Sequence, residues 1–278
     1  MSYATLLVQV ELGRSNEAPL AVARDLAQRT QSHVAGIAAA MPLQIVVGDG
    51  GLYGVDIIRE DGEAIESEAR IAEAEFRAAL NNHPDGIEWD MAVTRFPLSD
   101  RVAEAACAAD LIVTGVAQGG EEPSNSSRRV DVDDLIMRAG RPVLVVPLGI
   151  RQFGFGTALV AWKDTREARR AVVDALPLLR EMDKVVIARI ADISEQGPAQ
   201  TGLYKMVAWL ARQGVTATPR LVLSGGHDGD RLLSLAEEER AELVVAGAYG
   251  HSRIREWVMG GVTRTLLRQG GRCLLLSH

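Results

Sequence analysis

The two halves of this sequence repeat one another, and this repeat constrains the fold more than any other feature. The segment ADLIVTG at residues 109–115 returns as AELVVAG at residues 241–247. The segment RPVLVVP at residues 141–147 returns, in the same order along the chain, as GRCLLLS at residues 271–277. A repeat of this length predicts two domains rather than a solenoid of small units. We expect the first domain in residues 1–149 and the second in residues 150–278.

Within each copy, short apolar segments alternate with helical stretches such as residues 165–179. The strands predicted from this pattern are residues 6–11, 33–39, 87–94, 111–115 and 143–146 in the first copy, and 158–162, 184–191, 216–223, 243–247 and 273–276 in the second. The alternation predicts an α/β fold in which each domain has a five-stranded parallel sheet with helices on both faces. Such sheets bind ligands beyond the carboxyl ends of their strands.

Composition and charge exclude several classes of protein. The chain has 278 residues, of which 47% are hydrophobic and 24% charged, as in ordinary globular domains. It has no apolar run of the roughly 20 residues that a membrane span needs, and no signal-like start, so we expect a cytoplasmic protein without a membrane partner. A net charge of −7 gives no attraction to nucleic acid. Neither the histidines nor Cys107 and Cys273 have metal-ligand spacing, so we expect no metal site and two buried, reduced thiols.

Glycines follow the strand expected at residues 243–247 at a distinctive spacing. Gly247 and Gly250 precede, after nine further residues, the segment GGVT at residues 260–263. Glycines allow backbone amides to approach a ligand because no Cβ intervenes, and a helix beginning near Gly261 would add its unpaired N–H groups and positive dipole end. The spacing predicts an anion-binding loop. The alternative is that these glycines only shape a turn and a helix start.

This pattern resembles that of the universal stress protein family, whose nucleotide-binding members carry G-x2-G-x9-G-(S/T) between the fourth strand and fourth helix. The resemblance covers nearly the whole chain, as two copies. It implies tandem Rossmann-like domains that pair through their final strands as an intramolecular pseudo-dimer, and it leaves a further homodimer open. It also implies that the second domain binds an adenine nucleotide, ATP, with or without Mg²⁺. The residues implied to bind it are Ala161, Lys163, Ile190, Ala246, Gly247, Gly250, Gly260, Gly261, Val262 and Thr263.

The second copy departs from the family pattern at two positions. Gly261 stands where the family has its hydroxyl residue, and Lys163 stands where an acidic residue typically approaches the ribose or the metal. A lysine there could pair directly with phosphate, or it could simply be a solvated residue at a strand end.

The first copy has lost the glycine pattern altogether. Val130 and Asp131 replace the paired small residues, and Asp131, Asp133 and Asp134 would place negative charge at the start of the following helix. These carboxylates suit the helix dipole but repel phosphate. We therefore expect a degenerate first domain that binds no nucleotide, with Arg128 and Arg129 placed to neutralise the acids and close the surface.

One large insertion, residues 41–62, distinguishes the first copy from the second. Its apolar and glycine-rich composition fits a lid, a partner-binding segment, or an excursion that covers the domain interface. The stretch that follows, residues 63–80, is rich in alanine and glutamate and favours a solvated outer helix.

The segment LSGGHDG at residues 223–229 resembles the ATP-binding loop of PP-loop pyrophosphatases, which adenylate their substrates. It follows the third strand of the domain instead of the first, and Gly229 replaces the final hydroxyl residue. An ordinary helix start, matching SDR at residues 99–101, is the simpler interpretation.

We find no nucleophile elbow and no positioned general base, so we predict no catalytic residue and at most slow ATP hydrolysis. The leading hypothesis is a stress-response regulator that binds ATP in its second domain and signals to a protein partner. The alternative is a nucleotide-free structural or interaction module of the same fold.

Overall fold

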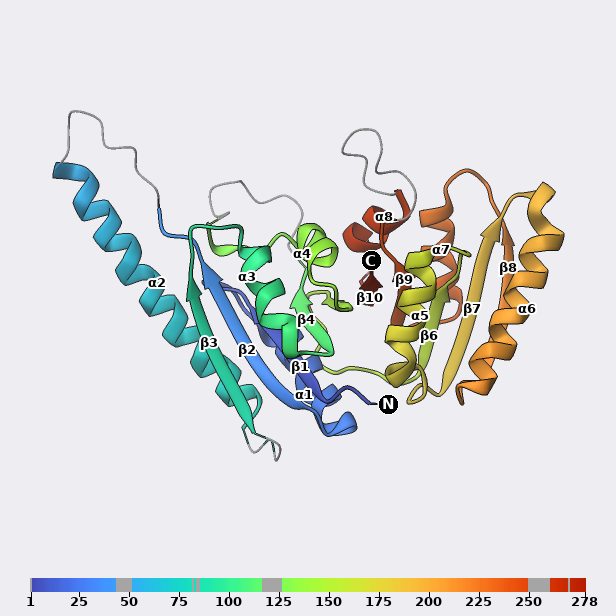
Figure 1. Ribbon diagram of the computed structural model, residues 1–278, viewed down its shortest axis with the longest axis horizontal. Helices are drawn as coiled ribbons and strands as arrows, with labels where there is room; N and C mark the ends of the chain where they lie inside the picture. The colour runs from blue at the N-terminus through green and yellow to red at the C-terminus, as the bar shows by residue number, and fades with distance from the viewer. Residues whose placement is uncertain are drawn as a thin grey trace. The chain divides into compact units, whose positions relative to one another are not determined.

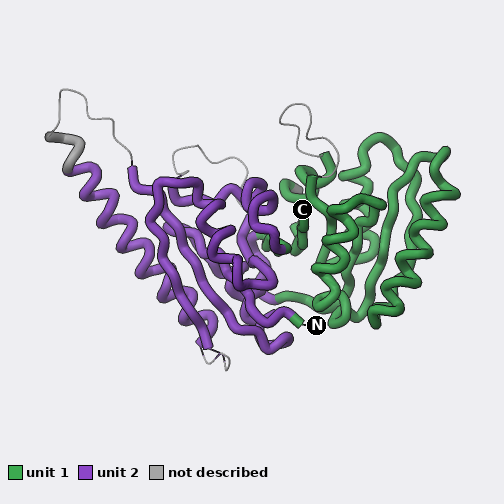
Figure 2. Tube along the Cα trace, viewed as in Figure 1, with its two compact units in different colours: residues 1–2, 142–147, 153–278 green, residues 3–141, 148–152 purple. Residues whose placement is uncertain are grey.

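The computed structural model describes residues 2–43, 52–81, 83, 86–116, 127–249, 261–269 and 271–278. The chain forms two compact units (Figure 2). The first, here called the N-terminal unit, comprises Tyr3–Arg141 and Leu148–Gln152. The second, called the C-terminal unit, comprises Met1–Ser2, Pro142–Pro147 and Phe153–His278. The short segment Pro142–Pro147 is therefore part of the first sequence copy but packs in the C-terminal unit.

The N-terminal unit is a parallel sheet with strand order β3-β2-β1-β4 and helices between the strands (Figure 1). Its elements are β1 (Thr5–Val10), α1 (Glu17–Thr30), β2 (His33–Ala40), α2 (Leu52–Ala79), β3 (Ile87–Val93), α3 (Leu98–Ala105), η1 (Ala106–Ala108), β4 (Leu111–Gly115) and α4 (Val132–Arg138). Strands β1 and β4 are almost wholly buried, which accounts for their continuous apolar sequences.

The C-terminal unit repeats this arrangement and adds two strands, β10 and β5. Its sheet has the order β5-β10-β9-β6-β7-β8, with every neighbouring pair parallel except β5 and β10. The elements are β5 (Val143–Val146), β6 (Thr157–Ala161), α5 (Arg166–Leu179), β7 (Lys184–Ala191), η3 (Ile193–Glu195), α6 (Gln196–Arg212), β8 (Ala217–Leu223), α7 (Asp228–Glu238), β9 (Leu243–Gly247), α8 (Gly261–Gln269) and β10 (Cys273–Ser277). Helix α5 packs on β9 and β10, α6 on β7 and β8, and α7 against α8.

These observations confirm the predicted fold class, an α/β protein built from tandem Rossmann-like repeats. The antiparallel pair of β5 and β10 joins the last strand of one copy to the last strand of the other, with Val145 opposite Leu274. This is the final-strand pairing that the resemblance implies. The predicted boundary at residue 149 stays a prediction, since the compact units divide the chain differently around β5.

The repeat extends to the roles of individual side chains. In the N-terminal unit, the Asp110 carboxylate accepts hydrogen bonds from the backbone N–H groups of Ala4 (2.7 Å) and Thr5 (3.0 Å), at the start of β1. In the C-terminal unit, Glu242 accepts one from Gly156 (2.7 Å), just before β6. A Cβ at Gly154 would lie 2.3 Å from the Glu242 carboxylate. Glycine in the segment that joins the copies therefore leaves room for this carboxylate.

The insertion in the first copy is in large part helical. Helix α2 begins at Leu52, so the second half of residues 41–62 forms its first turns, while residues 44–51 lie outside the described part of the chain. The sequence favours a solvated helix here, but one face of α2 is buried. Phe76 is fully buried, and its ring lies 5.4 Å from that of Trp89. A Cβ at Gly36 would lie 2.7 Å from Phe76, so this glycine permits α2 to pack on the sheet.

Two expectations about cysteine and membrane segments can also be compared with the structure. Cys273 is buried, and burial together with the charge of Glu242 raises the pKa of its thiol to about 12. Cys107 is exposed, so the prediction of two buried thiols is wrong for this residue, which lies in the short turn η1 at the surface. Within the described ranges, no helix combines the length and the apolar character that crossing a membrane requires.

Candidate functional site

In the sheet of the C-terminal unit, the strand order reverses between β6 and β9. Several of the predicted site residues lie at this point. From β6 the chain continues outward through β7 and β8, and then returns to β9 on the other side of β6 (Figure 1). At this switch point Ala161 pairs with Ala246, directly before Gly247. Open α/β sheets bind ligands in the crevice at such a point, beyond the carboxyl ends of the strands.

Lys163 follows the end of β6, and Ile190 is the second-last residue of the adjacent strand β7, at the same edge. Ala161 of β6 pairs with Ala188 of β7, so Lys163 and Ile190 each lie two residues beyond this pair. Lys163 is exposed and Ile190 is half-buried. The structure thus brings five predicted residues to one edge of one sheet, namely Ala161, Lys163, Ile190, Ala246 and Gly247. Gly250 and Gly260 lie outside the described residues, so the loop itself stays a prediction.

Gly247 is required by packing, whether or not a ligand binds. A Cβ at this position would lie 2.5 Å from the backbone nitrogen of Ala168 and 2.6 Å from the carbonyl carbon of Glu167. Contacts this short do not occur, so only glycine allows β9 to approach the first turn of α5. For this one glycine, the structural interpretation is sufficient.

The start of α5 is already satisfied by its own side chains. The Thr165 hydroxyl accepts a hydrogen bond from the backbone N–H of Ala168 (3.3 Å). Glu167 is 8% exposed. Burial alone would raise the pKa of its carboxyl group, but hydrogen bonds from its own backbone N–H and from Thr165 lower the pKa overall. The backbone N–H groups of Glu167 and Ala168 are therefore already bound by side chains of this helix start.

The start of α8 is different, because it carries no acidic residue in its first turn. Among the described residues, no heavy atom would lie within 4 Å of a Cβ at Gly261. Val262 is 37% exposed, whereas Thr263 is 5% exposed. The first N–H groups of a helix have no partner within the helix and carry its partial positive charge. This end of α8 is therefore suited to a bound anion.

The equivalent helix of the N-terminal unit, α4, is closed to anions by its own acids. The Asp131 side chain caps the helix by accepting a hydrogen bond from the backbone N–H of Asp134 (3.0 Å), and Asp133 also lies in the first turn. Burial works to raise the pKa of Asp134, but Arg138 and the Ser99 hydroxyl lower it overall. The first copy thus has the acidic helix start that its sequence predicts.

Arg128 does not neutralise these acids, so that part of the prediction is wrong. Its guanidinium donates instead to Asp61 (2.6 Å), to Glu68 (3.1 Å) and to the carbonyl oxygen of Met41 (3.2 Å). The Arg128 and Asp61 side chains are only 7% and 8% exposed. Arg128 therefore fixes α2 to the segment that follows residues 117–126.

The strand ends of the two units also differ in polarity. Gln9 and Thr114 of the N-terminal unit occupy the positions that Ala161 and Ala246 occupy in the repeat. The Thr114 hydroxyl donates to the Gln9 side-chain oxygen (2.7 Å), and the two residues are 0% and 2% exposed. Glu11 corresponds to Lys163. Burial raises the pKa of Glu11, although the charges of Arg14 and Arg129 oppose this effect.

Residues 223–229 form an ordinary helix start. The Ser224 hydroxyl donates to the Asp228 carboxylate (2.7 Å), and Asp228 and Asp230 both lie in the first turn of α7. A Cβ at Gly229 would lie 2.8 Å from the side chain of Thr265, so this glycine allows α7 and α8 to pack closely. Nothing in this arrangement favours a phosphate-binding loop.

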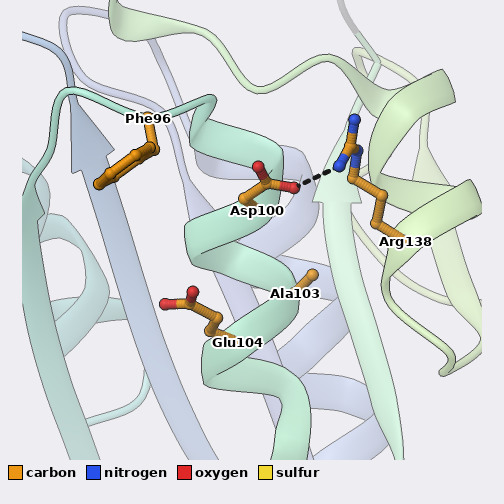
Figure 3. Close-up of a pocket in the computed structure, with 5 residues that line it drawn as sticks. All are labelled: Phe96, Asp100, Ala103, Glu104 and Arg138. Atoms are coloured by element: carbon orange, nitrogen blue, oxygen red, sulfur yellow. Dashed lines mark ion pairs between the residues drawn. The ribbon is translucent and has the colours of Figure 1, made fainter.

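A hollow on the surface of the N-terminal unit lies away from all predicted site residues. It is lined by Phe96, Asp100, Ala103, Glu104 and Arg138 (Figure 3). The Phe96 ring is 74% exposed. Arg138 pairs with Asp100 (2.9 Å) and Asp134 (2.7 Å), so its charge is already compensated. This hollow therefore does not serve as an anion site.

Sequence reasoning missed one polar residue at the candidate site. Ser277 pairs with Gly247 across β10 and β9 and is 1% exposed. Its hydroxyl, like the indole nitrogen of the buried Trp162, has no hydrogen-bond partner among the described residues. The match between GRCLLLS and RPVLVVP places Ser277 at a strand end, but the pairing of β10 with β9 is needed to bring it beside Gly247. Buried polar groups are usually satisfied, so both atoms are open to a water molecule or a ligand.

Residues 154–270 match the model of the universal stress protein family. A universal stress protein from Archaeoglobus fulgidus DSM 4304 has a TM-score of 0.70 and 14% identity, with 99% of this chain and 98% of that chain covered. A putative universal stress protein from Pseudomonas aeruginosa UCBPP-PA14 has a TM-score of 0.65 and 16% identity, with 99% and 93% covered. A functionally unknown protein from Pseudomonas aeruginosa PAO1 has a TM-score of 0.60 and 15% identity, with 99% and 92% covered. No curated protein matches the sequence.

Proposed function

We propose that this protein is a stress-response regulator that binds ATP at the carboxyl edge of its C-terminal unit. The proposal is supported by the match of residues 154–270 to the model of the universal stress protein family and by the similarity of the fold to a universal stress protein over 99% of this chain. The proposed binding residues are Ala161, Lys163, Ile190, Ala246 and Gly247, together with the loop glycines Gly250 and Gly260 and the helix start Gly261, Val262 and Thr263. The proposed protein acts in the cytoplasm. The bound nucleotide alters a surface that a protein partner recognises.

The observation that carries this proposal is the contrast between two equivalent helix starts. Helix α8 begins at a glycine, has no acid in its first turn and follows β9, one of the two strands at the switch point. Helix α4, at the matching place, uses its own aspartates as cap and first-turn residues. An anion is therefore favoured at one start and repelled at the other.

The proposed activity is binding rather than catalysis. The carboxylates nearest the end of β6 are Asp164, which pairs with Arg169 (2.7 Å), and Glu167, which is turned to the start of its own helix. Neither is free to act as a general base toward a water molecule. Hydrolysis of a bound nucleotide is expected to be slow.

Equilibrium dialysis with ATP tests the proposal. We expect the wild type to bind, and Gly261→Asp to weaken binding by more than about tenfold, since it places a carboxylate where α4 has one. Gly197→Asp, at an open position in the first turn of α6, is the matched control and should bind as the wild type does. No binding by the wild type at millimolar nucleotide would contradict the proposal.

The second candidate function is a nucleotide-free structural or interaction module. It is favoured by Gly247, whose presence the packing of α5 explains completely. Under this hypothesis Gly261→Asp behaves like the wild type in every binding assay and has unchanged or slightly higher stability, because an acid in the first turn of a helix is favourable.

A further inference from the structure

The carboxyl edge of the C-terminal unit is poorly suited to a divalent cation. Mg²⁺ is bound in proteins by carboxylates and other oxygen ligands. Across the described ranges, His, Cys, Asp and Glu side chains form no group of three or more that could hold a metal ion. The nearest carboxylate, Asp164, accepts two hydrogen bonds from Arg169, from Nη2 at 2.7 Å and from Nε at 2.9 Å. Glu167 is buried and satisfied by the start of α5. The donor set therefore does not fit Mg²⁺.

The same edge presents a cation of its own, Lys163. Its side chain is exposed, and its carbonyl oxygen accepts a hydrogen bond from the backbone N–H of Thr165 (2.7 Å), which fixes the backbone at this point. In the part of the chain that the structure describes, Lys163 forms no salt bridge. The first turn of α8 adds no acid that could compensate this charge. A lysine and a helix start both favour an anion and disfavour a metal ion.

We infer that the C-terminal unit binds its polyphosphate ligand as the free anion, with Lys163 supplying the positive charge that a divalent cation would otherwise supply. This inference rests on the proposed nucleotide-binding function and specifies its chemistry. A free triphosphate carries more negative charge than its Mg²⁺ complex, so it interacts more strongly with the ammonium group and the helix start. The corresponding position in the N-terminal unit is Glu11, which has the opposite charge.

Equilibrium dialysis of ATP with EDTA and with excess Mg²⁺ tests this inference. We expect the wild type to bind at least as tightly in EDTA as in Mg²⁺, and ATP to bind more tightly than ADP or AMP. Lys163→Ala should weaken binding in EDTA by about tenfold or more, as expected for the loss of one charge-assisted hydrogen bond. Lys205→Ala, which removes an exposed lysine from α6, is the matched control and should have no effect.

The reverse substitution sharpens the test. Lys163→Asp restores an acid at the strand end, so its binding of ATP should be weak in EDTA and recover when Mg²⁺ is added. Wild-type binding that requires Mg²⁺, or Lys163→Ala binding equal to the wild type in EDTA, would overturn the inference but leave the proposed function intact. If the wild type binds ATP in neither buffer, the proposed function itself fails.

Discussion

The two units place the same elements at the same edge but supply them with opposite chemistry. In the C-terminal unit, the strand ends carry Ala161 and Ala246, and the helix that follows begins at Gly261 with no acid in its first turn. In the N-terminal unit, the hydrogen-bonded pair of Gln9 and Thr114 occupies the strand ends, and Asp131 caps the helix. The C-terminal unit thus has small apolar residues at these two strand ends, whereas the N-terminal unit has polar side chains that satisfy one another.

The N-terminal unit makes internal contacts at the edge where we propose that the C-terminal unit binds its ligand. Arg128, from the segment after residues 117–126, is committed to Asp61 and Glu68 of the inserted helix α2. The backbone N–H of Met41 donates to the carbonyl oxygen of Ser127 (2.7 Å), which ties the end of β2 to the same segment. These contacts hold α2 and the end of β2 to the segment that begins at Ser127.

The largest expected effect comes from removing the centre of this network. Arg128→Met leaves the Asp61 carboxylate buried without its cation, which should lower the free energy of unfolding of the N-terminal unit by about 3–5 kcal/mol. Chemical denaturation, followed by hydrogen exchange in the N-terminal unit, measures the change. The substitution should leave ATP binding by the C-terminal unit unaltered.

Arg138→Met is the matched control, because Arg138 also bridges two aspartates but is 49% exposed. Exposed pairs contribute at most about 1 kcal/mol, so this variant should lose far less stability than Arg128→Met. Equal losses in the two variants would show that the buried network does not hold α2 in place.

A second prediction compares the glycines at the ends of β9 and β4. Gly247→Ala places a Cβ against the backbone of Ala168 and should destabilise the C-terminal unit by about 1–3 kcal/mol. The nearest neighbour of a Cβ at Gly115 is Cγ of Pro19, at an ordinary contact distance of 3.9 Å. Gly115→Ala should therefore be close to neutral in thermal denaturation. Comparable melting temperatures for the two variants would contradict a packing role specific to Gly247.

The sequence predicts much of this fold, because repeats and apolar runs are local signals. The strand expected at residues 243–247 coincides with β9, and the helix expected at residues 165–179 differs from α5 by a single residue at its start. The acidic start of α4 is likewise visible in the letters DVDD at residues 131–134.

The contacts that define the two edges are not local, and sequence reasoning misses them for that reason. Arg128 and Asp61 are separated by 67 positions, and no local sequence pattern in either segment indicates that the two side chains will pair. The glycine spacing indicates a ligand at Gly247, but the close approach of α5 that requires this glycine appears only when the sheet is assembled. The exposure of Cys107 depends in the same way on how a short turn lies on the surface.

The smallest expected effect, and the most direct comparison of the two edges, is the dependence of stability on pH. Glu11 has a raised pKa in the folded N-terminal unit, so the folded state holds its proton more tightly than the unfolded state does. The contribution of Glu11 to stability is therefore fully present below the unfolded pKa of about 4.5 and is lost as pH rises through the folded pKa. Glu167 has a lowered pKa, so its contribution is present above that same unfolded pKa and is lost as pH falls through the folded one.

Glutamine substitutions separate these two contributions. Glu11→Gln should remove part of the decline in stability of the N-terminal unit as pH rises above 4.5, and Glu167→Gln should remove part of the decline in the C-terminal unit as pH falls below 4.5. Hydrogen exchange of each unit, measured across this pH range, gives the two profiles independently. Shifts of the same sign in both variants would contradict the opposite directions in which the two units move the pKa values of these carboxyl groups.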